Sequence, residues 1–396
     1  MVAGHLLLVA TVGFLHEAHA VVPHREEPEH SAFHTFMRQH GRQYAPGSDE
    51  YHQRLALFSR RAAEAEAHNA RPGKLWTAGI NRLSDRTDGE LAQLRGWRGA
   101  AATARGAGRA SGFLQPSGNT GSFLNQRGRG RPLPEQFMNW TTLQAAKDIF
   151  DQGACGSCWA VASSKVLQLH QQIHRPRSPR TFSTQELVSC VANPHKCGGT
   201  GGCEGATVEL AFDWALNRGL AQENEVPYRA FTGTCSAGSG AMVQLGQHDL
   251  SLEDLTTPGV HQAPAGAPGL AFGMHGWERL QENGYEALLR ALHDHGPVGV
   301  SVAARPWAAY LHGIFDGCER DAVIDHAVVL IGYGKDPGSG VLFYDIQNSW
   351  GPDWGEKGHI RLLRREGDGE WCGTDRQPEV GTGCEGGPKE VKVCGM

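Results

Sequence analysis

The chain has 396 residues, which is long enough for two or three compact units and a sizeable buried core. Its formal net charge is only -5 at pH 7, so the basic excess that marks a nucleic-acid-binding protein is missing, and we expect no nucleic-acid partner. The composition favours a peptide or a small molecule as the partner.

The first twenty residues are typical of a secretory signal peptide. The apolar run Leu6–Leu15 is too short to span a bilayer, and Ala18 and Ala20 are small residues where a signal peptidase cuts. We predict that residues 1–20 are a signal peptide rather than a frayed hydrophobic tail. No later stretch is apolar enough for a membrane helix, so we expect no membrane partner. The mature protein is expected in the secretory pathway, in a lysosome or vacuole, or outside the cell.

Residues 21–96 are predicted to form a helical unit. A shorter amphipathic segment with Phe33 and Phe36 comes first, and after it the side chains recur at steps of three and four, as on one face of a helix. The residues on this face are Glu50, Arg54, Phe58, Arg61, Ala65 and Asn69. An ordinary helical hairpin would explain this pattern by itself.

Residues 97–131 have the composition of a flexible linker. The stretch is rich in Gly, Ala, Ser and Arg, ends in Arg127-Gly-Arg-Gly-Arg131, and has no apolar periodicity that would let it pack. Because an exposed, basic and flexible segment is easily cut, we predict that the chain is processed here.

Residues 132–376 are predicted to be a globular domain that is helical first and stranded later. The predicted helices cover residues 157–174, 183–188 and 206–217, and the predicted strands cover residues 298–303, 327–333, 341–347 and 359–363. We therefore expect an α+β fold of two packed halves with a cleft between them.

Two segments fall outside this pattern. Residues 236–273 are dominated by Gly, Ala, Pro and His and are predicted to be a surface insertion, and residues 377–396 are predicted to be a C-terminal extension. All ten cysteines lie after residue 150. This segregation suggests a disulfide-bearing domain that follows a cysteine-free one.

A thiol, an imidazole and a carboxamide occur in the order of a nucleophile, its base and the group that orients the base. Cys158 lies at the start of a predicted helix, where backbone N–H groups and the helix dipole favour a thiolate. His326 would act as base and acid, and Asn348 would orient its ring. Gln152 would join the Cys158 N–H in binding the oxyanion. No metal and no cofactor is implied.

Two other interpretations use the same cysteines. Cys155 and Cys158 form a C-x-x-C motif at a helix start, as in thioredoxin-like redox proteins, but no βαβ pattern precedes it. His195, Cys197 and Cys203 offer zinc ligands, but their spacing lacks a second compact pair. Neither interpretation gives a role to the later histidine and asparagine.

The motif Cys155-Gly-Ser-Cys158-Trp159 matches the signature of the papain family, and the chain resembles a papain-family cysteine protease precursor of the cathepsin L-like branch. Glu50-x3-Arg54-x3-Phe58 and the segment Gly79–Asp85 resemble the two propeptide motifs of that branch, with Leu83 in place of a phenylalanine. The resemblance implies a two-lobed fold, with a helical left lobe and an antiparallel β-barrel-like right lobe, behind a helical inhibitory propeptide.

The same resemblance implies a cysteine endopeptidase made as a zymogen. It assigns Cys158 as nucleophile, His326 as acid and base, Asn348 as its orienting partner and Gln152 as oxyanion donor. Expected partners are protein and peptide substrates, the chain's own propeptide as an intramolecular inhibitor, and cystatin-like inhibitors, and a monomer is expected. Because the propeptide is dense in His, Glu and Arg, acidification to about pH 5 is expected to weaken its ion pairs and to speed processing.

Family pairing implies three disulfides. They are Cys155–Cys203, Cys190–Cys235 and Cys318–Cys372. The pairing of three other cysteines stays undecided. A bridge between Cys384 and Cys394 would tie down the C-terminal extension, but Cys197 would compete with Cys203 or pair with either tail cysteine.

The resemblance also implies a set of substrate-binding residues. They are Gly205 and Ala206 beside the substrate, Val208, Ala327 and Gln377 around the pocket for the second residue before the cut, and Trp354 as a platform on the leaving-group side. A mostly apolar pocket predicts an aliphatic or aromatic preference there, because burying an unpaired charge is costly.

Two further functions stay open. A papain-fold protein that binds or stores without catalysis is the alternative from another class, although such proteins usually lose the nucleophile that is present here. Exopeptidase activity would need an added loop near the active site, and His248 and His261 in the predicted insertion keep that question open.

Overall fold

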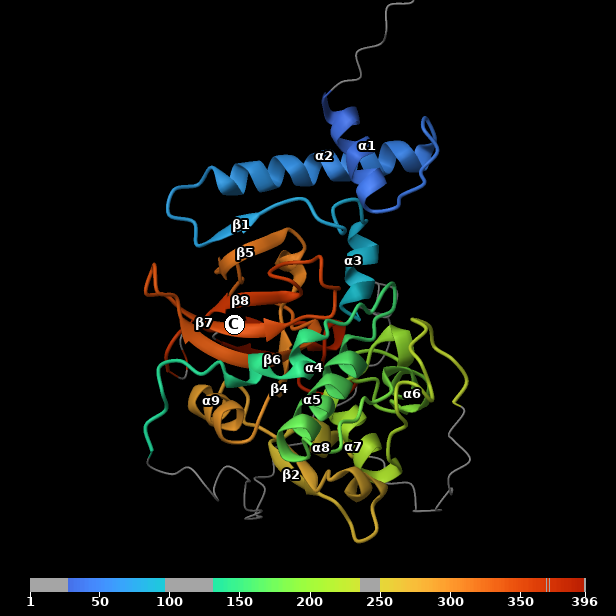
Figure 1. The fold of residues 1–396 in the computed structure, drawn as a ribbon, viewed down its shortest axis with the longest axis vertical. Helices are drawn as coiled ribbons and strands as arrows, with labels where there is room; N and C mark the ends of the chain where they lie inside the picture. Colours follow the sequence, from blue (N-terminus) through green and yellow to red (C-terminus); the bar gives the residue numbers. More distant parts are fainter. Residues whose placement is uncertain (1–27, 97–130, 236–249, 368, 370, 395–396) are drawn as a thin grey trace, which may run out of the picture.

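The computed structural model describes residues 28–96, 131–235 and 250–394, apart from residues 368 and 370. The predicted signal peptide, all but the last residue of the predicted linker, and the part of the predicted insertion before residue 250 lie outside the described residues. In Figure 1 the N-terminal helices lie across the top of the molecule, a sheet lies in the middle, and most other helices lie below it to one side.

The segment of residues 28–96, here called the prosegment, is mainly helical. It contains α1 (Pro28–Gln39), α2 (Asp49–Asn69), β1 (Trp76–Ala78) and α3 (Asp88–Leu94). Ser48 caps α2 through its hydroxyl, and Thr87 and Glu90 form a reciprocal capping box at α3. The helices α1 and α2 pack through an aromatic cluster. Its members are Phe33, Phe36, Tyr51 and Phe58.

The prosegment joins the sheet of the C-terminal half. The six strands run in the order β1-β5-β8-β7-β6-β4, with β5 and β8 parallel and the other neighbours antiparallel. The five strands beside β1 are β4 (Val298–Val302), β5 (Tyr310–Phe315), β6 (His326–Lys335), β7 (Leu342–Gln347) and β8 (His359–Leu363). Figure 1 shows β1 next to β5, below α2.

The helical half follows the prosegment in the chain. Its helices are α4 (Gln144–Lys147), α5 (Cys158–His174), α6 (Thr184–Cys190), α7 (Val208–Arg218) and α8 (Leu252–Thr256), whereas α9 (Tyr285–Asp294) packs against β4 and β6. The short strands are β2 (Gly259–Gln262), β3 (Gly276–Arg279), β9 (Gly373–Asp375) and β10 (Val391–Val393). Single 3-10 turns are η3 (Asn139–Thr142), η4 (Gly202–Glu204), η5 (Pro268–Phe272), η6 (Arg305–Trp307) and η7 (Pro378–Val380).

Each half has its own hydrophobic core. Apolar positions of α5 and α7 fill the helical half, and tyrosines of the strands fill the sheet half together with Trp307, Trp350 and Trp354, which lie outside the strands. The described part of the predicted surface insertion belongs to the first core, because Leu255 and Phe272 are only 4% and 7% exposed. The expectation of a pattern-poor surface segment was therefore wrong for residues 250–273.

Four disulfides tie the described residues. Cys155–Cys203 and Cys190–Cys235 are formed, as the family pairing implies. The implied Cys318–Cys372 bridge is not, since Cys372 pairs with Cys394 and Cys318 is a free thiol. Cys197 pairs with Cys384, so a Cys384–Cys394 bridge is absent as well.

The changed pairing follows from where the tail runs. β10 pairs with β9 directly after Cys372, which brings Cys394 to that position. Earlier in the tail, the N–H of Gly198 donates to Gly383 and the N–H of Glu385 donates to His195, so Cys384 lies beside Cys197. Through Cys384 and Cys394, the tail thus links the helical half covalently to the region around Cys372.

Candidate active site

Cys158 is the first residue of α5, so its thiol lies where the helix leaves backbone N–H groups without helical partners. Backbone N–H groups of Ala327 and Trp159 lower the pKa of the thiol, although its burial outweighs them. Since Ala327 follows His326 at the start of β6, the contact with its N–H brings the thiol from the helical half against the imidazole-bearing strand of the sheet half.

His326 is fully buried and is held by Asn348. Its Nε2 lies 2.8 Å from Asn348 Oδ1, which also accepts the N–H of Ser349. An oxygen that accepts a backbone N–H does not donate, so His326 Nε2 carries the proton and Nδ1 keeps a lone pair. Nδ1 has no hydrogen-bond partner within the described part of the chain. The ring is therefore ready to accept a proton.

An aromatic wall shields this hydrogen bond from water. The Trp350 ring lies 5.0 Å from the His326 ring, and Trp307 meets the same ring edge-on at 6.3 Å. Trp354, the predicted leaving-group platform, is fully buried against Trp350 and Trp307 while the prosegment is in place. Water exclusion strengthens the electrostatic contacts inside such a site.

Gln152 is fully buried and fixed by its neighbours. Ser349 donates its hydroxyl to Gln152 Oε1 at 2.6 Å, so the amide NH₂ faces the cleft. Gln152 Nε2 donates to the carbonyls of Leu94 and Cys155, each at 2.7 Å. A carbonyl oxygen of the prosegment thus accepts a hydrogen bond from Gln152, the predicted oxyanion donor.

The prosegment passes through the site. After Leu94, the Arg95 carbonyl lies 3.8 Å from the Cys158 sulfur, and the Arg95 Nε lies 2.7 Å from Asp325 Oδ2. Gly96 then packs over Gly205, where a side chain on Gly205 would lie within 2.8 Å of the Gly96 carbonyl. Gly205 also has φ +93, a conformation that L side chains rarely adopt, so glycine is required there.

Burial sets the protonation states in the precursor. It raises the pKa of Cys158 to about 11, against the backbone hydrogen bonds that lower it. It lowers the pKa of His326 to about 4, against the bond to Asn348. Burial also raises the pKa of Asp325, opposed mainly by Arg95. In this closed state Cys158 and His326 are both neutral at neutral pH.

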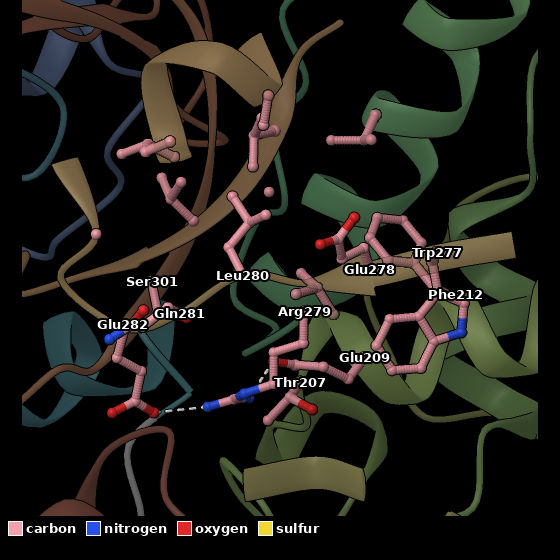
Figure 2. A pocket seen from close by; sticks show the side chains of 18 of the residues that line it. Thr207, Glu209, Phe212, Trp277, Glu278, Arg279, Leu280, Gln281, Glu282 and Ser301 are labelled. Carbon is pink, nitrogen blue, oxygen red and sulfur yellow. Dashed lines mark hydrogen bonds and ion pairs between the residues drawn. The ribbon is translucent and has the colours of Figure 1, made fainter. Parts of the chain in front are cut away.

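The residues predicted for the second pocket are only partly brought together. A cavity of about 990 Å³ is lined by Val208 among many others, and Figure 2 shows its charged and aromatic side chains near Thr207. Ala206 and Ala327 are buried and Gln377 is exposed, and none of these three lines that cavity. Arg279 projects into this region, but Glu209 and Glu282 neutralise its charge.

The disulfides decide against the two other interpretations of the cysteines. Cys155 is bonded to Cys203 and not to Cys158, so the C-x-x-C motif is not a redox pair. Cys197 and Cys203 are both in disulfides, which leaves no thiolate for zinc. Cys158 remains a free thiol.

Three contributors were missed by sequence reasoning. Ser349 orients Gln152, Arg95 crosses the site, and Asp325 holds Arg95. Ser349 and Asp325 directly follow and precede predicted catalytic residues, which was the only available signal. Nothing around Arg95 distinguishes it from the other arginines of the prosegment.

The fold and the site together define a papain-like thiol hydrolase fold closed by a prosegment. The model of the papain family of cysteine proteases matches residues 133–382, and that of the cathepsin propeptide inhibitor domain matches residues 33–91. The chain therefore belongs to the papain family of cysteine proteases.

Relatives in plants agree with this assignment. Vignain of Ricinus communis is 32% identical over 263 residues, which cover 65% of this chain and 62% of vignain. The senescence-specific cysteine protease SAG12 of Arabidopsis thaliana is 28% identical over 333 residues, with 83% of each chain covered. This chain spans 61% of cysteine protease 1 and 58% of the oryzain beta chain, both of Oryza sativa subsp. japonica.

Solved proforms share the fold. A recombinant stem bromelain precursor superposes with a TM-score of 0.61 at 24% identity, covering 86% of this chain and 94% of that one. The digestive procathepsin L2 proteinase of Tenebrio molitor larval midgut gives a TM-score of 0.62 at 21% identity, covering 92% and 100%. Within the described residues, no helix is long and apolar enough to cross a bilayer.

Proposed function

We propose that this protein is a cysteine endopeptidase made as an inactive precursor, and that its prosegment is the intramolecular inhibitor. One observation carries the proposal. A peptide of the chain itself lies across Cys158, with its Leu94 carbonyl on Gln152 and its Arg95 carbonyl beside the thiol. The cleft therefore holds peptide backbone at the atoms that amide hydrolysis needs.

The geometry supports a two-stage mechanism. The Cys158 thiol gives its proton to His326 Nδ1, and the sulfur attacks the carbonyl carbon of the substrate. The oxyanion that forms accepts hydrogen bonds from the Cys158 N–H and from Gln152 Nε2. The tetrahedral adduct then collapses, the C–N bond breaks, and His326 protonates the leaving amine, so the acyl group stays on sulfur.

Water completes the reaction. His326 takes a proton from water as the water attacks the thioester carbonyl, and the second adduct expels the Cys158 thiolate. Asn348 holds the ring in register in both stages, because its Oδ1 binds the protonated Nε2 throughout. The products are a carboxylic acid and an amine.

Several finer features belong to the proposal. The pocket that contains Val208 is proposed to prefer an aliphatic or aromatic second residue before the cut, supported by its large volume and by the neutralised Arg279. A peptide library in which arginine was the best residue there would contradict this. Residues 1–20 are proposed as a signal peptide for a secretory, lysosomal or vacuolar destination, with a monomeric mature protein that binds cystatin-like inhibitors.

The test compares the wild-type chain with Cys158→Ser. Both precursors are cut within residues 97–131 by an arginine-specific serine protease, which is then inactivated. The wild type should hydrolyse a fluorogenic peptide with an apolar second residue and should react with a thiol-directed epoxide. Cys158→Ser should lose at least about 10³-fold in kcat/KM.

A matched control tests whether the other free thiol, Cys318, contributes to either measurement. Cys318→Ser should behave as the wild type in both measurements, because Cys318 is a free thiol that takes no part in the proposed mechanism. A wild-type protein that is cut and folded but neither hydrolyses peptides nor binds the epoxide would be a non-catalytic member of the family, and the proposal would fail.

A further inference from the structure

Asp325 and Arg95 form an ion pair inside the cleft. Their side chains are 6% and 9% exposed, and Arg95 Nε lies 2.7 Å from Asp325 Oδ2. A charged pair removed from water in this way is retained only where both charges are matched. The pair is thus a specific contact between the peptide in the cleft and the wall of the cleft.

The carboxylate is held in place by the protein. The Ala304 N–H donates to Asp325 Oδ1 at 3.0 Å, and the Asp325 N–H donates to Val302 at 3.0 Å. Oδ2 points to Arg95. When the prosegment leaves, the carboxylate keeps its orientation and loses its cationic partner. A preoriented acceptor of this kind costs little to engage again.

Asp325 lies on the leaving-group side of Cys158. Gly96, on one side of the thiol, packs over Gly205 of the helical half. Leu94, on the other side, belongs to the same hydrophobic cluster as Trp307 and Trp354.

Its place in the sequence and one contact assign Asp325 to the second of these sides. It directly precedes His326, the proton donor to the leaving amine, and it binds the Ala304 N–H at the start of η6, which carries Trp307. The bound cation is therefore beyond the scissile position.

We infer that Asp325 selects peptides that carry arginine or lysine directly after the scissile bond. This inference rests on the proposed function. Arginine should be favoured over lysine, because the planar guanidinium presents several donors to a carboxylate. The chain's own Arg95 occupies the place of that side chain in the precursor.

The test uses the full chain after processing and two quenched fluorogenic peptides. The peptides share an apolar second residue before the cut and differ only in having arginine or citrulline after it, and mass spectrometry establishes that both are cut at the same bond. Citrulline keeps the shape and removes the charge. The wild type should show a kcat/KM about fivefold higher for arginine, since the solvated cleft weakens the charge contact.

Variants locate the effect. In Asp325→Asn the preference should fall to about one, and in Asp325→Glu it should persist. Glu135→Gln removes a surface charge that is paired with Lys335 and should keep the wild-type ratio. Because the ratio is measured within each protein, a general loss of activity next to His326 does not affect it.

The outcomes separate the two proposals. Equal cleavage of both peptides by the wild type, or an unchanged ratio in Asp325→Asn, overturns the role of Asp325 while leaving the peptidase intact. No cleavage of either peptide overturns the proposed function. If Asp325→Asn fails to fold, the wild-type ratio at 0.05 and 0.5 M salt decides, because a charge-based preference must shrink with salt.

Discussion

At the scale of single residues, the protonation state of the catalytic thiol in the precursor depends on its burial more than on its position at a helix start. A cysteine at a helix start is expected to be acidic, yet burial in the precursor raises the pKa of Cys158 to about 11 and lowers the pKa of His326 to about 4. Because the closed site holds thiol and imidazole, and an open site would hold thiolate and imidazolium, the pair carries one proton in both states.

The difference in protonation predicts that Cys158 is alkylated much faster in the processed protein than in the precursor. In a Cys318→Ser background, which removes the other free thiol, the precursor should react with iodoacetamide only as the pH approaches about 11. The processed protein should react at pH 6 at least about tenfold faster than the precursor. The measurement is the rate of alkylation from pH 5 to pH 11. Superimposable pH profiles would show that the prosegment does not control the thiol.

The catalytic positions were predictable because each lies in a short motif. Cys158 and Gln152 are six residues apart, and Asn348 is next to Ser349 and Trp350. The contact of Arg95 with Asp325 spans 230 positions and has no local pattern. The pairing of Cys372 failed for the same reason, since it depends on where the tail strand β10 runs.

At the scale of elements, the predicted helix over residues 50–69 is confirmed by α2, and two residues of its predicted face bind partners outside the helix. Arg54 lies 3.5 Å from Glu50 on its own helix and forms a closer pair with Glu90 at the start of α3. Asn69 binds both the N–H and the carbonyl of Ala78, which fixes β1 to α2. The strands β1 and β5 were not predicted, because β1 has only 3 residues and β5 lacks alternation of polar and apolar residues.

The Arg54–Glu90 pair should resist the acidity expected to drive processing. Despite burial, hydrogen bonds from Arg54 and Thr87 lower the pKa of Glu90 to about 2. Stability from this pair is present above the unfolded pKa of Glu90, about 4.3, and is lost only as the pH falls through about 2. At pH 5 the pair is still ionised. A faster processing rate at pH 5 must therefore come from other groups.

Removing the charge of Glu90 should weaken the packing of the prosegment at pH values above about 4.3, where the ion pair with Arg54 is fully formed. Glu90→Gln is expected to raise the rate of processing at pH 7 by about fivefold, because it removes the ion pair with Arg54, whereas glutamine still completes the capping box with Thr87. Glu64→Gln, which removes a mostly exposed charge near Arg60, should process as the wild type. The rates are read from gels at pH 5 and pH 7. Equal rates for all three proteins would contradict this role.

At the scale of the whole molecule, a histidine joins the two halves. The Nε2 atom of His170, on α5, lies 2.9 Å from the carbonyl oxygen of Pro297, the residue just before β4. Burial lowers the pKa of His170 to about 4, helped by His174 and His295 and opposed by the bond to Pro297. Between pH 6.5 and pH 4 the unfolded chain binds a proton that the folded chain does not, so stability falls as the pH falls through this window.

The expected loss from His170 is about 2 kcal/mol by pH 4, allowing for partial exposure of the ring. His170→Gln keeps a donor for the Pro297 carbonyl and should flatten this part of the pH profile, whereas His52→Gln, at an exposed position, should not. Urea unfolding of the precursor at pH 7 and pH 4 measures the difference. Parallel losses in His170→Gln and the wild type would place the acid sensitivity elsewhere.

Domain order and the two-half architecture followed from the sequence, because helical and stranded patterns are separated along the chain. The course of the tail and the buried role of residues 250–273 did not, because both depend on partners far away in sequence. Leu255 and Phe272 have no regular spacing, yet both fill the core beneath α5 and α7.

The strand β1 completes one border of the sheet, and its removal has a cost for the product. Trp76–Ala78 supplies the antiparallel neighbour of Tyr310–Phe315. Excision of the prosegment strips that border and leaves a row of unmatched amide and carbonyl groups, the kind of template on which chains associate into aggregates. The mature protein should therefore self-associate more readily than the inactive precursor. A low concentration of the mature protein, or its rapid binding to a substrate or inhibitor, would limit this association.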